Sequence, residues 1–362
     1  MPGLFEAVPN FSEGRDRAVI AELAGEGALD VHADPAHHRC VVTLAACTAE
    51  RLVDLVVERV AVAVARLDLG AHSGVHPRVG VADVLPIVPL GSASWDSAAA
   101  AARSLASRVW AELGVPVYFY GALAGGRRLA DIRRGGEPLD VGDRLHPSAG
   151  ACCVGVRPPL VAYNLLPPLP AEQVRALVPR LRRLPGVQAL SFALPDGRVQ
   201  LSLNLTDLGA VGVAHAFAEV VRLAGVPPAA VEPELVGLCP AAAAGPGCDG
   251  RVLEARVAAV AASSAAVACL AAGGDELERV AARLRTSAEA LRGLASDPAA
   301  LLSGAEQAAA LRRVVRAARV GDACIETLLG FAAEELLAAV DPAAREEFGE
   351  RVRLLERWLA AG

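Results

Sequence analysis

The chain contains no lysine, so all 35 of its basic residues are arginines, and they stand against 41 acidic residues for a formal net charge of −6. Binding to the phosphates of a nucleic acid or an anionic membrane needs clustered cations. The balance of charge therefore argues against either as the main partner. Aromatic residues are scarce at 4%. Small metabolites are the ligands that we expect.

Paired metal-ligand spacings are also missing. The eight cysteines are scattered through apolar stretches, and none is arranged as Cys-x-x-Cys. This pattern predicts small buried side chains rather than a zinc site, a disulfide framework or a reactive thiol. We therefore expect no metal.

Long apolar runs are absent too. Residues 257–272 are uncharged but fall short of the ~20 apolar residues that span a bilayer, and they are mainly alanine and serine. The N-terminal residues lack the pattern of a secretory signal. We expect a cytoplasmic protein with a buried helix at this position.

What the sequence does contain is enough apolar material, 54% of 362 residues, for two or three globular units. Apolar periodicity predicts strand, helix, strand, strand, helix and strand in residues 4–8, 18–24, 28–33, 40–46, 49–67 and 79–90. A helix over 95–113 and a strand over 115–120 follow. The order β-α-β-β-α-β is typical of a sheet covered by helices on one face.

The same order starts again near residue 160. Strands are predicted at 160–166, 187–194, 199–205 and 231–238, and helices at 171–184 and 210–224, with an Asp-Gly turn joining the middle strands. Residues 121–155 are rich in Gly, Arg and Asp and indicate a linker that wraps a cleft. Beyond residue 250 the apolar spacing is helical.

We therefore predict an α/β (α+β) fold of two βαββαβ, ferredoxin-like subdomains that form a cleft, followed by an all-α C-terminal region. The expected boundaries are residues 1–155 for the first subdomain with its linker, 156–245 for the second and 250–362 for a helical extension. The extension could be a dimerisation arm or a degenerate relic.

The strongest candidate for chemistry is the Gly- and Pro-punctuated stretch of residues 70–90. Pro77 biases His76 toward extended backbone, and Arg78 follows directly. Histidine titrates near neutral pH and carries protons, while arginine is suited to gripping carboxylates. The pair therefore favours an anionic substrate. The polar turn of residues 34–39 belongs to the same predicted unit.

Five segments in order resemble the glutamate formimidoyltransferase (formiminotransferase) family. They are VPNFSEGR at 8–15, DPAHHR at 34–39, GVHPRVGVADVLPIVPL at 74–90, HPSAGACCVGVRPPLVAYN at 146–164 and ELVGLCP at 234–240. The resemblance implies two α/β subdomains and a homodimer. It also implies transfer of a formimidoyl group from N-formimidoylglutamate to N5 of tetrahydrofolate, the co-substrate, in histidine degradation.

The resemblance gives His76 the catalytic role, as a general acid/base with a pKa near 7 that protonates the departing glutamate amine. Our hypothesis is that Arg78 or Arg39 binds a substrate carboxylate in a bidentate manner. Asp34 or another acid would orient His76.

Substrate or folate contacts are expected from further residues of the matching motifs. His37 and His38 could equally well just close their turn. In residues 140–156, short side chains and backbone would let a flat pterin approach closely. The candidates for binding are Asn10, His37, His38, Arg39, Asp83, Asp140, His146, Ser148, Gly150 and Ala151.

The chain departs from the family pattern in the folate segment. It has Leu139-Asp140-Val141-Gly142-Asp143 where many members have Pro-Asp-Phe-Gly-Pro, and Leu166 in place of an asparagine. A different amino-acid donor, or 5-formyltetrahydrofolate as substrate, is therefore an alternative. A non-catalytic folate-binding or assembly protein is another. The Pro-Gly-Gly-Gly-Ser motif of a cyclodeaminase domain is missing, so we expect no such activity.

Overall fold

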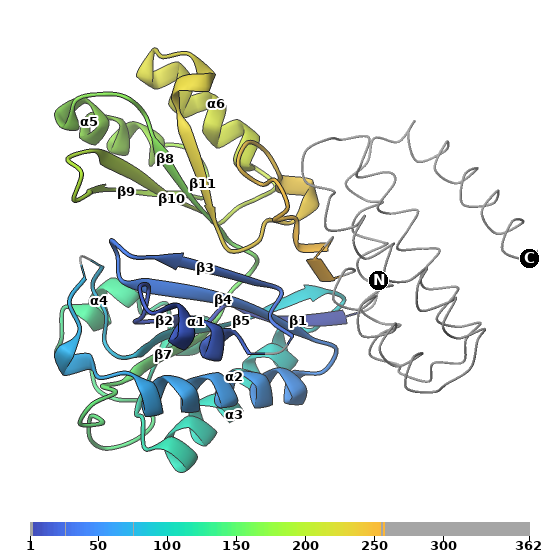
Figure 1. The fold of residues 1–362 in the computed structure, drawn as a ribbon. Helices are drawn as coiled ribbons and strands as arrows, with labels where there is room; N and C mark the ends of the chain where they lie inside the picture. Colours follow the sequence, from blue (N-terminus) through green and yellow to red (C-terminus); the bar gives the residue numbers. More distant parts are fainter. Residues whose placement is uncertain (1–2, 26, 75, 255, 258–362) are drawn as a thin grey trace, which may run out of the picture.

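The computed structural model describes residues 3–25, 27–74, 76–254 and 256–257, and these residues form two β-sheets with helices (Figure 1). The elements of the first sheet and its helices are β1 (Gly3–Ala7), β2 (Asn10–Phe11), α1 (Arg17–Ala24), β3 (Asp30–Asp34), β4 (Arg39–Ala46), α2 (Ala49–Arg66), β5 (Ala82–Gly91), α3 (Trp95–Leu113), β6 (Val117–Gly121), α4 (Leu129–Arg133) and β7 (Cys152–Val156). Those of the second are β8 (Val161–Leu166), α5 (Ala171–Leu181), β9 (Val187–Ala193), β10 (Val199–Leu205), α6 (Val213–Ala224) and β11 (Glu232–Val236).

The large sheet has seven strands, and β1 and β2 both lie between β4 and β5. β3 pairs with the outer side of β4, while β7 pairs with β5 and β6 completes the sheet. β1 is antiparallel to β5, with Phe5 opposite Pro89. β7 runs parallel to both β5 and β6.

Helices α2 and α3 cover one face of the large sheet (Figure 1). In α2, Leu52, Val56, Val60 and Ala63 recur at helical spacing and are fully buried against the sheet. Thr48 accepts a hydrogen bond at the start of α2, and Ser94 does the same for α3. These contacts fix where each helix begins, and they make this face the core of the unit.

The small sheet is antiparallel throughout, in the order β11-β8-β10-β9. α5 and α6 bury Val174, Leu177, Leu181, Ala216 and Val220 in the core that lies against it. The small sheet with its two helices has the element order expected from the sequence.

The prediction for residues 121–155 was wrong in part. Cys152–Val156 forms strand β7, between β5 and the edge strand β6, rather than the end of a linker, and all five of its residues are buried. A short helix, α4, lies within the same stretch. A strand buried on both faces reads as a plain apolar run, here without the alternation that marks a half-exposed strand.

The cysteines follow the expectation with one correction. Within the described ranges Cys40, Cys152, Cys153, Cys239 and Cys248 are free and buried, and burial raises the pKa of the Cys40 and Cys153 thiols to about 12. Cys47, by contrast, is disulfide-bonded. The expected helical extension of residues 250–362 lies almost wholly outside the described residues. Every helix within the described ranges is too short or too polar to span a bilayer.

A buried carboxyl in β1 makes stability depend on pH. Glu6 is 6% exposed, and burial raises its pKa from 4.5 to about 7 although Arg157 opposes the shift. The free energy that Glu6 contributes to folding is fully present below pH 4.5 and is lost as the pH rises toward 7. Glu6→Gln is therefore expected to raise the free energy of unfolding by about 3 kcal/mol at alkaline pH, by linkage.

Chemical denaturation of both proteins across this pH range checks the expectation. The two should converge in acid, where Glu6 is protonated. A difference that does not change with pH would contradict the titration of Glu6.

Candidate functional site

Three chain segments meet at one end of the large sheet. They are the turn after β2, the loop between β3 and β4, and the loop between α2 and β5. The backbone N–H of Ser12 donates to Val81 O at 2.8 Å, and its hydroxyl donates to Gly80 O at 2.8 Å. Asn10 lies opposite Val41 of β4. These contacts bring together residues that the sequence places up to about 70 positions apart.

Asp34 organises the loop between β3 and β4. Its Oδ1 accepts hydrogen bonds from the backbone N–H groups of Ala36 and His37, at 2.7 and 2.9 Å, and its Oδ2 lies 2.5 Å from His37 Nδ1. Burial alone would raise the pKa of Asp34, but the hydrogen bonds from His37 lower it to about 2. Asp34 is therefore ionised and bonded to His37 in this structure. That Asp34 orients His76 stays a prediction.

The same loop packs tightly against the turn after β2. A Cβ atom on Gly14 would lie 2.3 Å from Asp34 O and 2.6 Å from Arg39 N. His38 adopts the left-handed conformation with φ of 49°, and its Nδ1 lies 3.6 Å from Glu13 Oε1. Glycine at position 14 thus allows the backbone approach on which the position of this loop depends.

His76 is held by Arg39. Arg39 Nη1 lies 2.6 Å from Nε2 and 2.9 Å from Nδ1 of His76, and Arg39 Nη2 donates to Asn10 Oδ1. A guanidinium carries only donors and a positive charge, so its place beside both ring nitrogens opposes protonation of the ring. Burial, Arg39 and Arg133 together lower the pKa of His76 to about 2. His76 is therefore neutral in this structure, which corrects the expected pKa near 7.

Arg78 connects the loop that contains His37 and His38 to the loop that contains His76. Its guanidinium donates to the carbonyl of His76 at 2.7 and 3.1 Å, to that of His38 at 3.2 Å and to that of His37 at 3.2 Å, and Nη1 also contacts His72 Nε2. All three of its nitrogens are thus engaged within the protein. That Arg78 binds a substrate carboxylate stays a prediction.

Asp83 lies on β5 and interacts with the arginines of the site. It is 2% exposed, accepts the backbone N–H of Val79 on Oδ1 at 2.8 Å, and pairs through Oδ2 with Arg133 Nη2 at 2.5 Å. Its charge also acts on Arg39 and Arg78. Asp83, expected as a ligand contact, is in this structure the carboxylate that neutralises part of a basic cluster.

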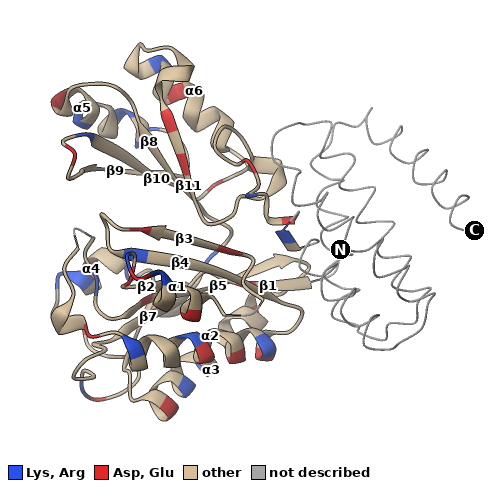
Figure 2. Cartoon of the chain, in the orientation of Figure 1, with Lys and Arg blue, Asp and Glu red and all other residues tan. Residues whose placement is uncertain are grey.

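Sequence reasoning missed Arg133. It stands at the end of α4, where Figure 2 shows basic residues gathered, in a run that includes Arg127, Arg128 and Arg134. Such a run resembles a solvated surface. Arg128 is indeed 73% exposed, but the Arg133 side chain is only 15% exposed. No local signal in the sequence separates the two.

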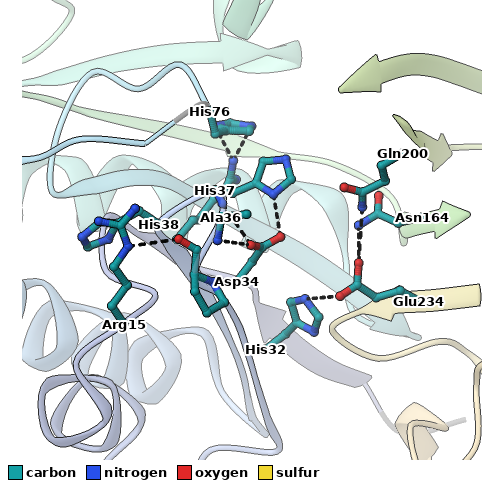
Figure 3. Close-up of polar contacts among 12 residues, drawn as sticks. Arg15, His32, Asp34, Ala36, His37, His38, His76, Asn164, Gln200 and Glu234 are labelled. Carbon is teal, nitrogen blue, oxygen red and sulfur yellow. Dashed lines mark hydrogen bonds and ion pairs between the residues drawn. The ribbon is translucent and has the colours of Figure 1, made fainter. Parts of the chain in front are cut away.

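The small sheet contributes a second set of side chains, of which Figure 3 labels Asn164, Gln200 and Glu234. Phe192 of β9 meets the His37 ring edge-on at a centroid distance of 5.4 Å. Glu234 of β11 accepts hydrogen bonds from Asn164 at 2.9 Å and Gln200 at 3.3 Å, and it lies 3.4 Å from His32 Nε2 on β3. The motifs at 146–164 and 234–240 contain Asn164 and Glu234, although no role was predicted for either.

The expected folate segment falls into two parts. Asp140 accepts from the backbone N–H of Phe119 at 2.8 Å and pairs with Arg127 at 2.6 Å. His146 Nδ1 accepts from the backbone N–H groups of Ser148 and Ala149. Among the described contacts these side chains have structural partners, so their contact with folate stays a prediction.

Residues 149–151 form backbone hydrogen bonds with the segment that follows His76. Val81 N donates to Ala149 O at 2.9 Å and Ala151 N donates to Val79 O at 3.0 Å. A Cβ atom on Gly80 would lie 1.9 Å from Ala151 O and 2.6 Å from Ala149 O. Gly150 and Ala151 are thus placed by the backbone of the loop that carries His76.

This close approach predicts a large effect for Gly80→Ala. Because backbone atoms cannot yield as a side chain does, we expect the free energy of unfolding to fall by about 3 kcal/mol, as for severe overpacking. Gly209→Ala is the matched control, since its Cβ would meet only Asp207 Oδ1 at 3.6 Å, and it should stay within about 0.5 kcal/mol of wild type. Urea unfolding measures both, and equal stabilities would contradict the packing described.

Within the described ranges, no group of three or more His, Cys, Asp or Glu side chains is arranged to hold a metal ion. What the site offers is a neutral imidazole, a carboxylate–histidine pair and three arginines around one carboxylate. Such an arrangement can move a proton next to an anionic ligand.

Several known proteins have sequences similar to that of this chain. The model of the formiminotransferase domain, N-terminal subdomain, matches residues 4–157. A glutamate formimidoyltransferase of Thermoplasma acidophilum is 38% identical over 271 residues, which cover 66% of this chain and 88% of that protein. One of Streptococcus pyogenes is 30% identical over 275 residues, covering 67% and 91%. A formimidoyltransferase-cyclodeaminase of Sus scrofa is 32% identical, and the match covers 66% of this chain but 51% of that protein.

Proposed function

Because the chain belongs to the formiminotransferase family, we propose that it transfers the formimidoyl group of N-formimidoylglutamate to N5 of tetrahydrofolate. The observation that carries the proposal is the neutral His76 beside Arg39, in the region that the family shares. The proposed product, 5-formimidoyltetrahydrofolate, places the reaction in one-carbon metabolism and histidine degradation.

The first step uses His76 as a base. The donor amidine is protonated at neutral pH. The lone pair of N5 attacks its carbon, a new N–C bond forms, and the C=N electron pair moves onto the terminal nitrogen, which becomes a neutral amine. N5 becomes cationic as it bonds, and its proton must leave. A neutral imidazole can accept this proton, whereas an imidazolium could not.

The second step uses the same group as an acid. The lone pair of the terminal nitrogen re-forms the C=N bond while the bond between the tetrahedral carbon and the glutamate nitrogen breaks, and the electron pair of the broken bond goes to the glutamate nitrogen. The His76 imidazolium returns its proton to the departing amine, so that the imidazole is neutral again at the end of the cycle. One residue thus moves one proton from the acceptor to the leaving group.

Arg39 must release His76 before this can happen. In the structure its Nη1 lies within 3 Å of both ring nitrogens, and its positive charge opposes protonation of the imidazole. A substrate carboxylate is a stronger partner for a guanidinium than a neutral imidazole is. We propose that donor binding draws Arg39 onto a carboxylate and frees His76, so that the base is available only when the donor is present.

Tetrahydrofolate would lie between the two sheets, where His37 meets Phe192. An aromatic side chain at that point suits a flat ring system. A cleft between the two subdomains, the folate contacts of residues 146–151, a homodimer and a cytoplasmic location are part of this proposal.

The proposal is tested by mixing purified protein with tetrahydrofolate and N-formimidoylglutamate, acidifying the mixture and following the absorbance of 5,10-methenyltetrahydrofolate. A signal that requires protein and donor supports it. Folded protein that gives no signal with this donor would contradict it. Titration with folate alone, and trials with 5-formyltetrahydrofolate or other formimidoyl amino acids, then distinguish a binding protein from a related transferase.

A further inference from the structure

The basic cluster at the site carries more positive charge than the protein neutralises. Arg39, Arg78 and Arg133 all act on one another electrostatically, and Asp83 is the carboxylate among them. Asp34 is engaged by His37, and His76 is neutral. An anion bound here would complete the charge balance.

The three arginines differ in how many donors remain available. Every nitrogen of Arg78 donates to a backbone carbonyl or contacts His72. Arg39 uses Nη1 and Nη2 on His76 and Asn10, but within the described part of the chain its buried Nε has no hydrogen-bond partner. Arg133 uses Nη2 on Asp83, and its buried Nε likewise has no partner among the described residues.

A buried donor without a partner costs free energy in the empty site. A carboxylate oxygen that accepted from Nε would remove that cost, because charge-assisted hydrogen bonds are the strong ones. Asp83 already fixes one nitrogen of Arg133, which holds the planar group in place. The remaining side of that group is then preorganised for an anion.

We infer that Arg133, together with Arg39, binds a carboxylate of the formimidoyl donor, and that Arg133 makes the site select a dicarboxylic donor. This inference rests on the proposed function. Arg78 then acts as the clamp that positions the His37 and His76 loops. The selected class is an amino acid with a side-chain carboxylate, in preference to one without it.

The test compares N-formimidoylglutamate with N-formimidoylglycine, which lacks the side-chain carboxylate. For Arg133→Met we expect the KM of the glutamate donor to rise about 10- to 100-fold, the loss of one charge-assisted pair. Its kcat and the KM of the glycine donor should change little, so that the preference between the donors is lost. Added methylguanidinium should restore part of it.

Two further variants control for folding. Arg133→Lys keeps a charge beside Asp83 but loses the planar fork, so it should fold and still lose donor preference. Arg128→Met removes an exposed arginine of the same region, which pairs with Asp131, and should behave as wild type. Equal loss with both donors, or an unchanged preference in both Arg133 variants, would overturn the inference.

Calorimetric titration with glutamate, the product, separates this inference from the proposed function. Binding that wild type shows and Arg133→Lys lacks would support the carboxylate site even if wild type catalysed no transfer. Turnover by wild type, with glutamate bound equally by both proteins, would leave the transferase in place and refute the role of Arg133.

Discussion

Replacing His76 by alanine is expected to lower kcat by about 10²- to 10⁴-fold, the usual contribution of a positioned acid or base. The imidazole is the proposed carrier of the proton that leaves N5 and reaches the departing amine. In the variant no neighbouring base is placed to replace it, because His37 is tied to Asp34 at 2.5 Å and its ring centroid lies 6.3 Å away. Fixed-time assays of methenyltetrahydrofolate formation measure the loss.

The fold should survive this change. The His76 side chain bonds to Arg39, whereas it is the carbonyl of His76, present in any variant, that holds Arg78. We expect the thermal midpoint to move by only a few degrees. His37→Ala is the comparison, and we expect it to weaken binding more than it lowers kcat. If His37→Ala removed turnover and His76→Ala did not, the proton carrier would be the Asp34–His37 pair.

Asp83→Asn is expected to cost about 3 kcal/mol of unfolding free energy, as for removal of one partner of a buried ion pair. The asparagine can still accept the Val79 N–H through its oxygen, so the change isolates the charge. It leaves the guanidiniums of Arg39, Arg78 and Arg133 without the carboxylate that acts on them. We also expect the KM of the glutamate donor to rise, because Arg133 loses its anchor.

Asp131→Asn is the matched control for the charge. Asp131 pairs with Arg128 and Arg134, whose side chains are 73% and 72% exposed. Exposed pairs contribute little, so a change within about 1 kcal/mol is expected. Urea denaturation of the three proteins measures the difference. A similar cost for both substitutions would show that Asp83 is not the buried counter-charge that the structure indicates.

Much of the fold follows from local patterns. The helix predicted over residues 95–113 coincides with α3, because Ser94 caps its start and Gly114, in the left-handed conformation, ends it. The missed strand β7 shows the limit. Its partners β5 and β6 are parallel to it and distant in sequence, and no local signal in an apolar run between glycines reports such pairing.

The functional site, too, could be predicted only in part from the sequence. His76, Asp34 and Arg39 could be selected from the sequence because their residue types, in motifs, carry the chemistry. The hydrogen-bond partner of each arginine could not be predicted, because guanidiniums reach their acceptors through tertiary contacts. Arg78 donates to the backbone of two loops, and Arg133 arrives from α4. The lowered pKa of His76 likewise depends on burial and on these neighbours.

The most direct measurement is an NMR titration of the His76 imidazole in protein labelled at histidine, with the signal assigned by its loss in His76→Ala. We expect His76 to remain neutral from about pH 8 down to about pH 5, since histidine in solution would titrate near 6.5. Addition of glutamate should shift its resonance as Arg39 moves to the carboxylate. A normal titration midpoint with no response to glutamate would contradict both the neutral base and its control by Arg39.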